Sequence, residues 1–348
     1  MKIENTASAH NPTLSIAKAL CIILMVVGHS GCPAYLHDWI YLFHMPCFFL
    51  ISGYLLKDRY IDNLKLAVRK RLKGLWIPYV KWSILFLLLH NAFYRIGLYP
   101  NIYSFKEIII KACKTLVFYG SEQLLWPFWF LSASLVASMI GLVYLKPCRQ
   151  KRNLTLFSIL GGGEICVLIA AVVDYSPIKI PLLGSVQWLA ASFFLMGYFF
   201  KRIQILQIPT YMVALMTIAL SLTPILFTAD INVKGWDCLM FSGTGIMGSM
   251  IVLKISAYLS KTKLSVVLDY IGSNTLYVLT FHLLAFKAVS CIKIVQYDMD
   301  WKNLLTIPVI EEYNQLYWLF YSVVGLMVPL MIQRLIRRTA LPFNNKYK

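Results

Sequence analysis

Long apolar runs alternate with short polar segments along the chain, and this pattern predicts membrane-spanning helices. A span needs roughly 20 apolar residues. Backbone groups in hydrocarbon must be satisfied within their own segment, so helices are expected. The runs cover residues 14–32, 39–56, 76–96, 125–145, 154–173, 186–200, 208–228, 239–255, 271–292 and 316–336. The sequence therefore predicts an all-α, polytopic membrane bundle of about ten transmembrane helices.

Composition supports a membrane protein and limits the domain organisation. Of the 348 residues, 59% are hydrophobic and 14% are charged, whereas soluble domains have about 25% charged residues. After ten spans only short loops remain, so we expect a single membrane domain over residues 1–348 and no separate soluble domain. The first run lacks a small-x-small cleavage site and is interpreted as a retained span.

The distribution of the 33 Lys and Arg residues predicts an orientation. If the N-terminus is cytoplasmic, most of these residues fall in inside loops, as the positive-inside rule requires. Both termini are then cytoplasmic in a multi-pass protein of the plasma (inner) membrane. The net charge of +18 is dispersed over many short loops. This favours contact with lipid headgroups and argues against a nucleic-acid partner.

Two ionisable residues in the first span, Lys18 and His29, share one helix face. The eleven steps of about 100° between them bring them nearly into line, about 16 Å apart along the axis. Lys18 lies toward the cytoplasmic side and His29 near the outer end. Ionisable residues inside spans are costly and therefore functional candidates. The simpler alternative is a snorkelling lysine and an interfacial histidine.

Two further histidines are candidates. His44 in "FHMPCFFLISGYL" is predicted to be level with His29, with Pro46 opening the helix there. The adjacent Ser52-Gly53 pair permits close approach of another helix. His282 in "YIGSNTLYVLTFHLLAF" lies about mid-membrane and needs a partner or a water-filled cavity.

Further charged and aromatic segments complete the set of candidates. Lys70, Arg71 and Lys73 in "AVRKRLKGLWIPY" suit phosphates, with lipid headgroups as the alternative ligand. Glu164 in "LGGGEIC" is expected to be deep and to pair with a basic residue, and Lys287 to reach toward water. The aromatics of "WPFWFLSASL" are interpreted as a structural belt at the interface. The eight scattered cysteines indicate buried small side chains and no metal site.

Five segments in order resemble the acyltransferase 3 family of bacterial inner-membrane O-acyltransferases, over residues 15–286. They are "IAKALCIILMVVGHSG", "FHMPCFFLISGYLLK", "RKRLKGLWIPY", "WPFWFLSASL" and "IGSNTLYVLTFH". The short form is similar to the fucose 4-O-acetylase-like and polysaccharide O-acetyltransferase members. The family's Arg, ten residues, then catalytic His fits Lys18 and His29. Its Arg-x-x-Arg donor motif maps best on Arg71 with Lys70 and Lys73.

The resemblance implies acyl transfer, usually of acetyl, to a sugar hydroxyl of a lipid-linked or exported glycan. The donor is cytoplasmic acyl-CoA, such as acetyl-CoA, acting as co-substrate with no bound cofactor. His29 would be the general base or carry the acyl group, and His44 or His282 would orient it or stabilise the oxyanion. Lys18 would join the basic cluster in binding the donor. The longest outer segments, 97–124 and 293–315, are expected to meet the acceptor.

Other functions remain open at this point. A non-enzymatic carrier for a lipid-linked glycan or an anionic solute would use the same buried histidines and basic loops. A second alternative is an acyltransferase with another donor, such as succinyl-CoA, or another acceptor, such as a peptide or antibiotic. The sequence leaves the oligomeric state open.

Overall fold

A computed structural model describes residues 11–120, 122–151 and 154–344, which form helices and no strand. The helices are α1 (Pro12–His29), α2 (Ala34–Tyr41), α3 (His44–Tyr54), α4 (Asp58–Asp62), α5 (Leu64–Arg71), α6 (Ile77–Arg95), α7 (Phe105–Leu116), α8 (Trp129–Gln150), α9 (Leu156–Val173), α10 (Ser185–Arg202), α11 (Thr210–Leu226), α12 (Asp237–Leu259), α13 (Ser265–Ser273), α14 (Thr275–Gln296) and α15 (Tyr317–Asn344). Shorter helical turns are the π-helix η1 (Leu72–Trp76) and the 3₁₀ turns η2 (Gln123–Phe128), η3 (Ile205–Gln207) and η4 (Trp301–Leu305).

Within the described part of the chain, seven helices are long and apolar enough to cross a membrane. They are Pro12–His29, Leu64–Arg95, Gln123–Gln150, Leu156–Val173, Asp237–Leu259, Thr275–Gln296 and Tyr317–Thr339. The shorter α11 is also apolar. The all-helical, multi-pass class is therefore confirmed, while the number ten and the cytoplasmic termini remain predictions.

Two of the predicted spans are broken, and the breaks lie near the candidate histidines. The run 39–56 was predicted as one helix, but α2 ends at Tyr41 and α3 begins at His44. Phe43 between them leaves the helical region, with φ −145°. Pro46 explains the break, because its ring would clash with the carbonyl of residue 42 in a continuous helix. The break makes His44 the first residue of α3.

The run 271–292 is divided in the same way. Asn274, with φ −120°, separates the end of α13 from the start of α14. His282 consequently lies about two turns into α14 and not in the middle of one continuous span.

Close helix packing in the middle of the bundle depends on two glycines. A Cβ on Gly53 of α3 would lie 1.8 Å from the carbonyl oxygen of Phe194 on α10. A Cβ on Gly197 of α10 would lie 1.9 Å from the carbonyl oxygen of Leu50. The two backbones are therefore in direct contact, which confirms the close approach predicted from Ser52-Gly53.

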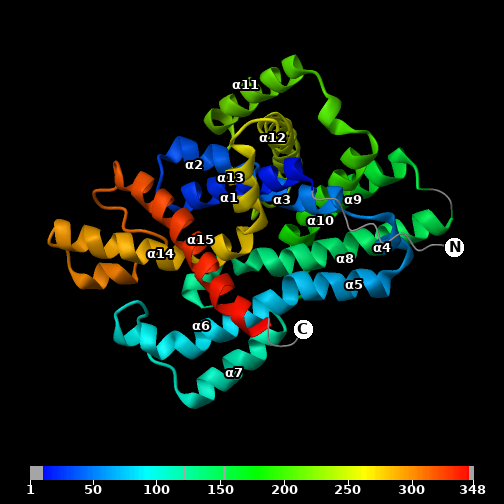
Figure 1. The fold of residues 1–348 in the computed structure, drawn as a ribbon. Coiled ribbons are helices and arrows are strands. Elements are labelled where there is room, and N and C mark those ends of the chain that lie inside the picture. The colour runs from blue at the N-terminus through cyan, green and yellow to red at the C-terminus, as the bar shows by residue number, and fades with distance from the viewer. Residues whose placement is uncertain (1–10, 121, 152–153, 345–348) are drawn as a thin grey trace.

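The bundle has two ends that differ in the segments they carry (Figure 1). α2 and the orange segment between α14 and α15 lie at one end, and α4 and α5 lie toward the other. α1 runs through the middle and packs against α3, α12, α13, α14 and α15. His29 ends α1 at the same end of the bundle as α2.

Candidate active site

Two of the predicted histidines form a buried pair. Nδ1 of His29 lies 3.1 Å from Nε2 of His282, and their rings are stacked with centroids 5.3 Å apart. His29 is 7% exposed and His282 is fully buried. The pairing puts the end of α1 and the first half of α14 at the same level of the bundle, although the sequence placed the two histidines at different depths.

The hydrogen bonds of His282 fix the protons on both rings. Nδ1 of His282 lies 2.9 Å from the carbonyl oxygen of Val278 and 3.1 Å from that of Leu279. Carbonyl oxygens only accept, so Nδ1 carries the proton and Nε2 of a neutral His282 is an acceptor. Nδ1 of His29 must then donate to it. Nε2 of His29 is left with a free lone pair, and no described residue hydrogen-bonds to it.

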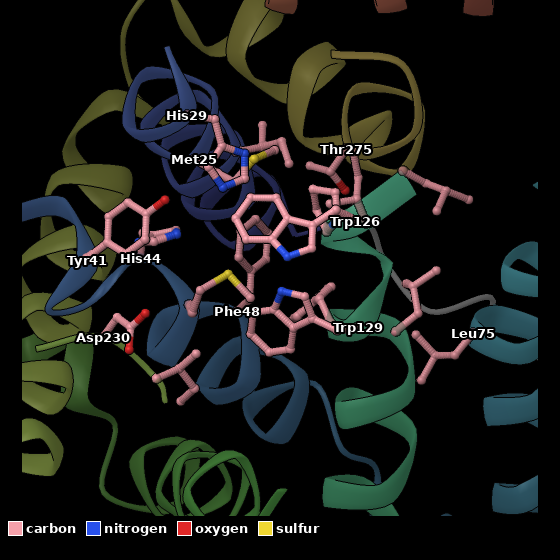
Figure 2. Close-up of a pocket in the computed structure, with 18 of the residues that line it drawn as sticks. Met25, His29, Tyr41, His44, Phe48, Leu75, Trp126, Trp129, Asp230 and Thr275 are labelled. Carbon is pink, nitrogen blue, oxygen red and sulfur yellow. The ribbon is translucent and has the colours of Figure 1, made fainter. Parts of the chain in front are cut away.

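His29 opens onto a cavity of about 240 Å³ between the helices. Ile22, Met25 and His29 follow one face of α1 along this cavity. Figure 2 shows His29, Tyr41, His44, Trp126 and Trp129 around the same space. His282 does not line the cavity and contacts it through His29. His29 is therefore the member of the pair that can touch a substrate.

Trp126 and Trp129 reach the wall of the cavity from two adjoining elements. Trp126 lies in η2, and Trp129 is the first residue of α8, after Pro127 and Phe128. The Trp126 ring lies 5.2 Å from His29 by centroids. In Figure 2 the indole nitrogens of Trp126 and Trp129 point toward one another. The interpretation of this segment as a structural belt therefore missed its place beside the histidine; its signal was two donors three residues apart around Pro127.

His44 presents an acceptor to the cavity. Its Nδ1 lies 2.8 Å from the carbonyl oxygen of Ile40, which makes Nδ1 the donor and leaves Nε2 of the neutral ring as an acceptor. An acceptor suits a hydroxyl group of a substrate. An oxyanion needs a donor instead, and the indole N–H groups of Trp126 and Trp129 are donors in the same wall.

Sequence reasoning also missed a polar cluster between α11 and α12. Asp230, Ile231 and Asn232 line the cavity opposite Leu75. The backbone N–H of Asn232 donates to Oδ1 of Asp230 at 2.8 Å, and its side-chain amide donates to Oδ2 at 3.0 Å. A loop carboxylate held in this way carries no pattern in the sequence that distinguishes it from other polar loop residues.

A second cavity, of about 280 Å³, holds part of the predicted basic cluster. Arg71 donates from Nη1 to the Ser52 hydroxyl at 2.8 Å and lies over the Phe194 ring. Lys70 donates from Nζ to the Tyr60 hydroxyl at 2.8 Å. The cations of Lys70 and Arg71 are thus held in place by neutral partners, and their charge remains available to an anionic ligand.

Gly74 and Leu75 line both cavities, so the two spaces adjoin. A Cβ on Gly74 would meet nothing within 4 Å. The space around Gly74 is therefore open on its Cβ side, and the cavity of His29 and the cavity of Lys70 and Arg71 are neighbours at η1.

The remaining members of the predicted donor site lie elsewhere. Lys73 lies on η1 and lines a separate open groove, whereas Lys70 and Arg71 line the second cavity, so the cluster of three is divided. Lys18 is half-buried on α1 and interacts electrostatically with Asp269 of α13. It lies one turn before Ile22 and is outside the walls of both cavities.

Two other expectations about charged side chains differ from the structure. Glu164 is exposed on α9, and its expected basic partner is not found among the described residues. Its depth in the membrane stays a prediction. Lys287 does not reach toward water, because its Nζ donates to the carbonyl oxygens of Leu304 and Thr306 at 2.7 and 2.6 Å. It fixes the C-terminal end of η4 against α14.

Comparison with known proteins identifies the fold that carries these cavities. The model of the acyltransferase 3 family, described as an acyltransferase domain, matches residues 11–334. The chain belongs to the acyltransferase 3 family. No curated protein and no solved structure matches it.

The family assignment confirms the resemblance seen in the sequence. The matched region of this acyltransferase domain includes His29, His44, Arg71, Trp126 and His282, and therefore both cavities and the junction between them. The protein is a multi-pass membrane protein with an acyltransferase fold.

Proposed function

We propose that this acyltransferase moves an acetyl group from cytoplasmic acetyl-CoA to a hydroxyl of a sugar in a cell-surface or lipid-linked glycan. The observation that carries the proposal is the free Nε2 of His29 in a cavity that adjoins a cationic one. A general base needs such a lone pair within reach of the proton it removes.

With His29 Nε2 as general base, the acyl transfer is a single displacement at the thioester. His29 Nε2 takes the proton of the acceptor hydroxyl, and the oxygen attacks the thioester carbonyl carbon. The new C–O bond forms, the C–S bond breaks, and the proton passes from His29 to the departing thiolate. In an acyl-histidine route, the lone pair of His29 Nε2 would instead attack the thioester carbonyl carbon, and the acceptor hydroxyl would then take the acyl group from the histidine. In both routes His282 is a positioning residue, because its only link to the cavity is the bond to His29 Nδ1.

The walls of the cavity supply the other requirements of acyl transfer. The indole N–H groups of Trp126 and Trp129 are donors for the developing oxyanion. His44 Nε2 and the Asp230 carboxylate are acceptors for sugar hydroxyls. Lys70 and Arg71 suit the phosphates of coenzyme A, with its narrow thiol arm passing Gly74.

The proposed location is the plasma (inner) membrane of a bacterium, with the Lys70 and Arg71 cavity on the cytoplasmic side. The dense basic segment 57–73 supports this orientation through the positive-inside rule. The donor then enters from the cytoplasm and the acceptor from the outer end.

Mass spectrometry of the surface glycans tests the proposal in cells. A strain lacking the gene is complemented with the wild type, with His29→Ala, or with His37→Ala, whose histidine lies outside both cavities. We expect the ester on the glycan to return with the wild type and His37→Ala and to be absent with His29→Ala, at normal glycan export. An unchanged ester in the deletion strain would refute the function. Loss of export with intact esters would support a carrier.

A further inference from the structure

A large open recess lies beyond the end of α1, outside both cavities of the proposed active site. Its volume is about 750 Å³. It is bounded by the loop after His29, by the C-terminal end of α14 and by the segment that leads into α15. Its lining includes Gly31, Gln296, Tyr297, Glu311, Tyr313, Asn314 and Gln315.

Two exposed tyrosines form a flat stack in this recess. The rings of Tyr297 and Tyr313 lie 4.6 Å apart by centroids with an interplanar angle of 4°. Tyr297 is 38% exposed and Tyr313 is 62% exposed. Stacked rings without burial gain little from the hydrophobic effect. The pair therefore does not belong to the core of the bundle.

The backbone at this stack is held in an unfavourable conformation. Tyr313 has φ +51° and Asp298, next to Tyr297, has φ +49°. A bulky residue with positive φ is costly, and such residues concentrate at ligand-binding sites. An exposed ring held in this way points to a surface that is built for a ligand.

Planar polar groups surround the stack and connect it to the catalytic histidine. The side chains of Gln296, Glu311 and Gln315 lie in the same recess. Asn314 donates from Nδ2 to the carbonyl oxygens of Ser30 and Gly31 at 3.2 and 2.8 Å. Its Oδ1 is buried, and no described residue hydrogen-bonds to it. Asn314 thus ties the tyrosine segment to the loop that follows His29.

Aromatic rings next to amide and carboxylate side chains are suited to binding a saccharide. The C–H face of a sugar ring packs on an aromatic ring, and its hydroxyls bond with planar side chains. Gly31 is two residues from His29, so their Cα atoms are at most about 8 Å apart. A sugar bound in the recess would therefore lie next to the loop that follows His29.

We infer that this recess is a saccharide-binding subsite, with the Tyr297–Tyr313 stack as its platform, that holds the acceptor glycan next to the sugar that is acylated. The inference rests on the proposed function and assigns a place to the substrate class of that function. The competing explanation is a pair of interfacial tyrosines that contact lipid headgroups only.

Steady-state kinetics of the purified full chain in lipid nanodiscs tests the inference. The acceptor probe is the cell's own surface glycan after mild base has removed its esters, with acetyl-CoA as donor. We compare Tyr297→Ala, Tyr313→Ala and Tyr313→Asn, because asparagine tolerates positive φ and removes only the ring. Tyr258→Ala on α12, whose tyrosine is 72% exposed, is the matched control.

We expect KM for the glycan to rise about tenfold in each platform variant, the effect of losing one stacking contact. The value of kcat and KM for acetyl-CoA should stay at wild-type levels, as should all constants of Tyr258→Ala. A glycan KM within twofold of wild type in Tyr313→Asn would overturn the subsite, and so would an equal rise in Tyr258→Ala. Inactivity of the wild type itself would refute the proposed function instead.

Discussion

At the scale of single residues, the chemistry depends on which nitrogen of each buried histidine carries a proton. The backbone carbonyls of Val278 and Leu279 fix the proton of His282, and His282 in turn fixes that of His29. The free lone pair on His29 thus depends on a hydrogen-bond chain that begins in the backbone of α14. This dependence can be tested without changing His29.

Substitution of His282 separates orientation from packing. His282→Gln offers a carbonyl oxygen that can still accept from His29 Nδ1, whereas His282→Leu offers none. We expect His282→Leu to lower kcat by roughly 10²-fold, toward the lower range for loss of a general base, and His282→Gln to retain more activity. Initial rates of thiol release from acetyl-CoA measure both. Equal activity of the two variants would contradict the positioning role.

Trp126→Phe removes one indole N–H and keeps an aromatic ring against His29. If the N–H stabilises the oxyanion, kcat should fall by up to about 10²-fold with KM for either substrate little changed. The same assay measures both constants. A rise in KM at constant kcat would show that Trp126 only binds substrate.

The site residues that the sequence predicted and those that it missed differ in what it costs to bury them. A histidine inside a span is costly, so His29, His44 and His282 were identifiable. In the structure His29 and His44 line one cavity, and His282 lies behind His29 and is hydrogen-bonded to it. Asp230 lies in a loop, where a carboxylate has no such cost. Glu164 was expected to have a basic partner, but its side chain lies on an exposed face of α9. An apolar run alone does not tell which face of a helix meets other helices.

At the scale of elements, the apolar runs predicted the helices but not the breaks. Run length reports burial in hydrocarbon and says little about φ and ψ at Phe43 or Asn274. Pro46 was the one local signal, and it marked the break that presents His44. The π-helix η1 had no sequence signal, although its Gly74 connects the two cavities.

Filling the junction between the cavities should block the donor. Because nothing lies within 4 Å of a Cβ on Gly74, Gly74→Phe should leave thermal stability near wild type and lower acetyl-CoA turnover at least tenfold. Gly243→Phe on α12 is the control, since its Cβ also meets nothing within 4 Å. Full activity of Gly74→Phe would exclude this path for the donor.

The glycine contact between α3 and α10 should matter for stability. A Cβ at Gly53 would lie 1.8 Å from a backbone carbonyl, which cannot move without shifting α10. We expect Gly53→Ala to cost about 1–3 kcal/mol or more, seen as a lower unfolding temperature in detergent. Gly163→Ala, whose nearest neighbour would be 3.7 Å away, should leave that temperature unchanged; equal temperatures for the two variants would refute this packing account.

At the scale of the whole molecule, the orientation in the membrane decides which substrate meets which cavity. The count of basic residues predicts cytoplasmic termini, which places residue 263 inside and residue 302 outside. In a Cys113→Ser background, a membrane-impermeant maleimide should label Lys302→Cys on intact cells, and Lys263→Cys only after permeabilisation. The reverse pattern would invert the topology and put the Arg71 cavity on the wrong side for acetyl-CoA.

The central claim is that His29 Nε2 transfers an acyl group from acyl-CoA to a sugar. The most direct measurement is transfer of isotopically labelled acetyl from acetyl-CoA to base-treated surface glycan by the purified protein in nanodiscs. The account predicts labelled ester on the glycan with the wild type, and a loss of about 10²–10⁴-fold with His29→Ala at unchanged unfolding temperature. If the wild type labels the glycan and His29→Ala labels it to the same extent, the result would contradict the account.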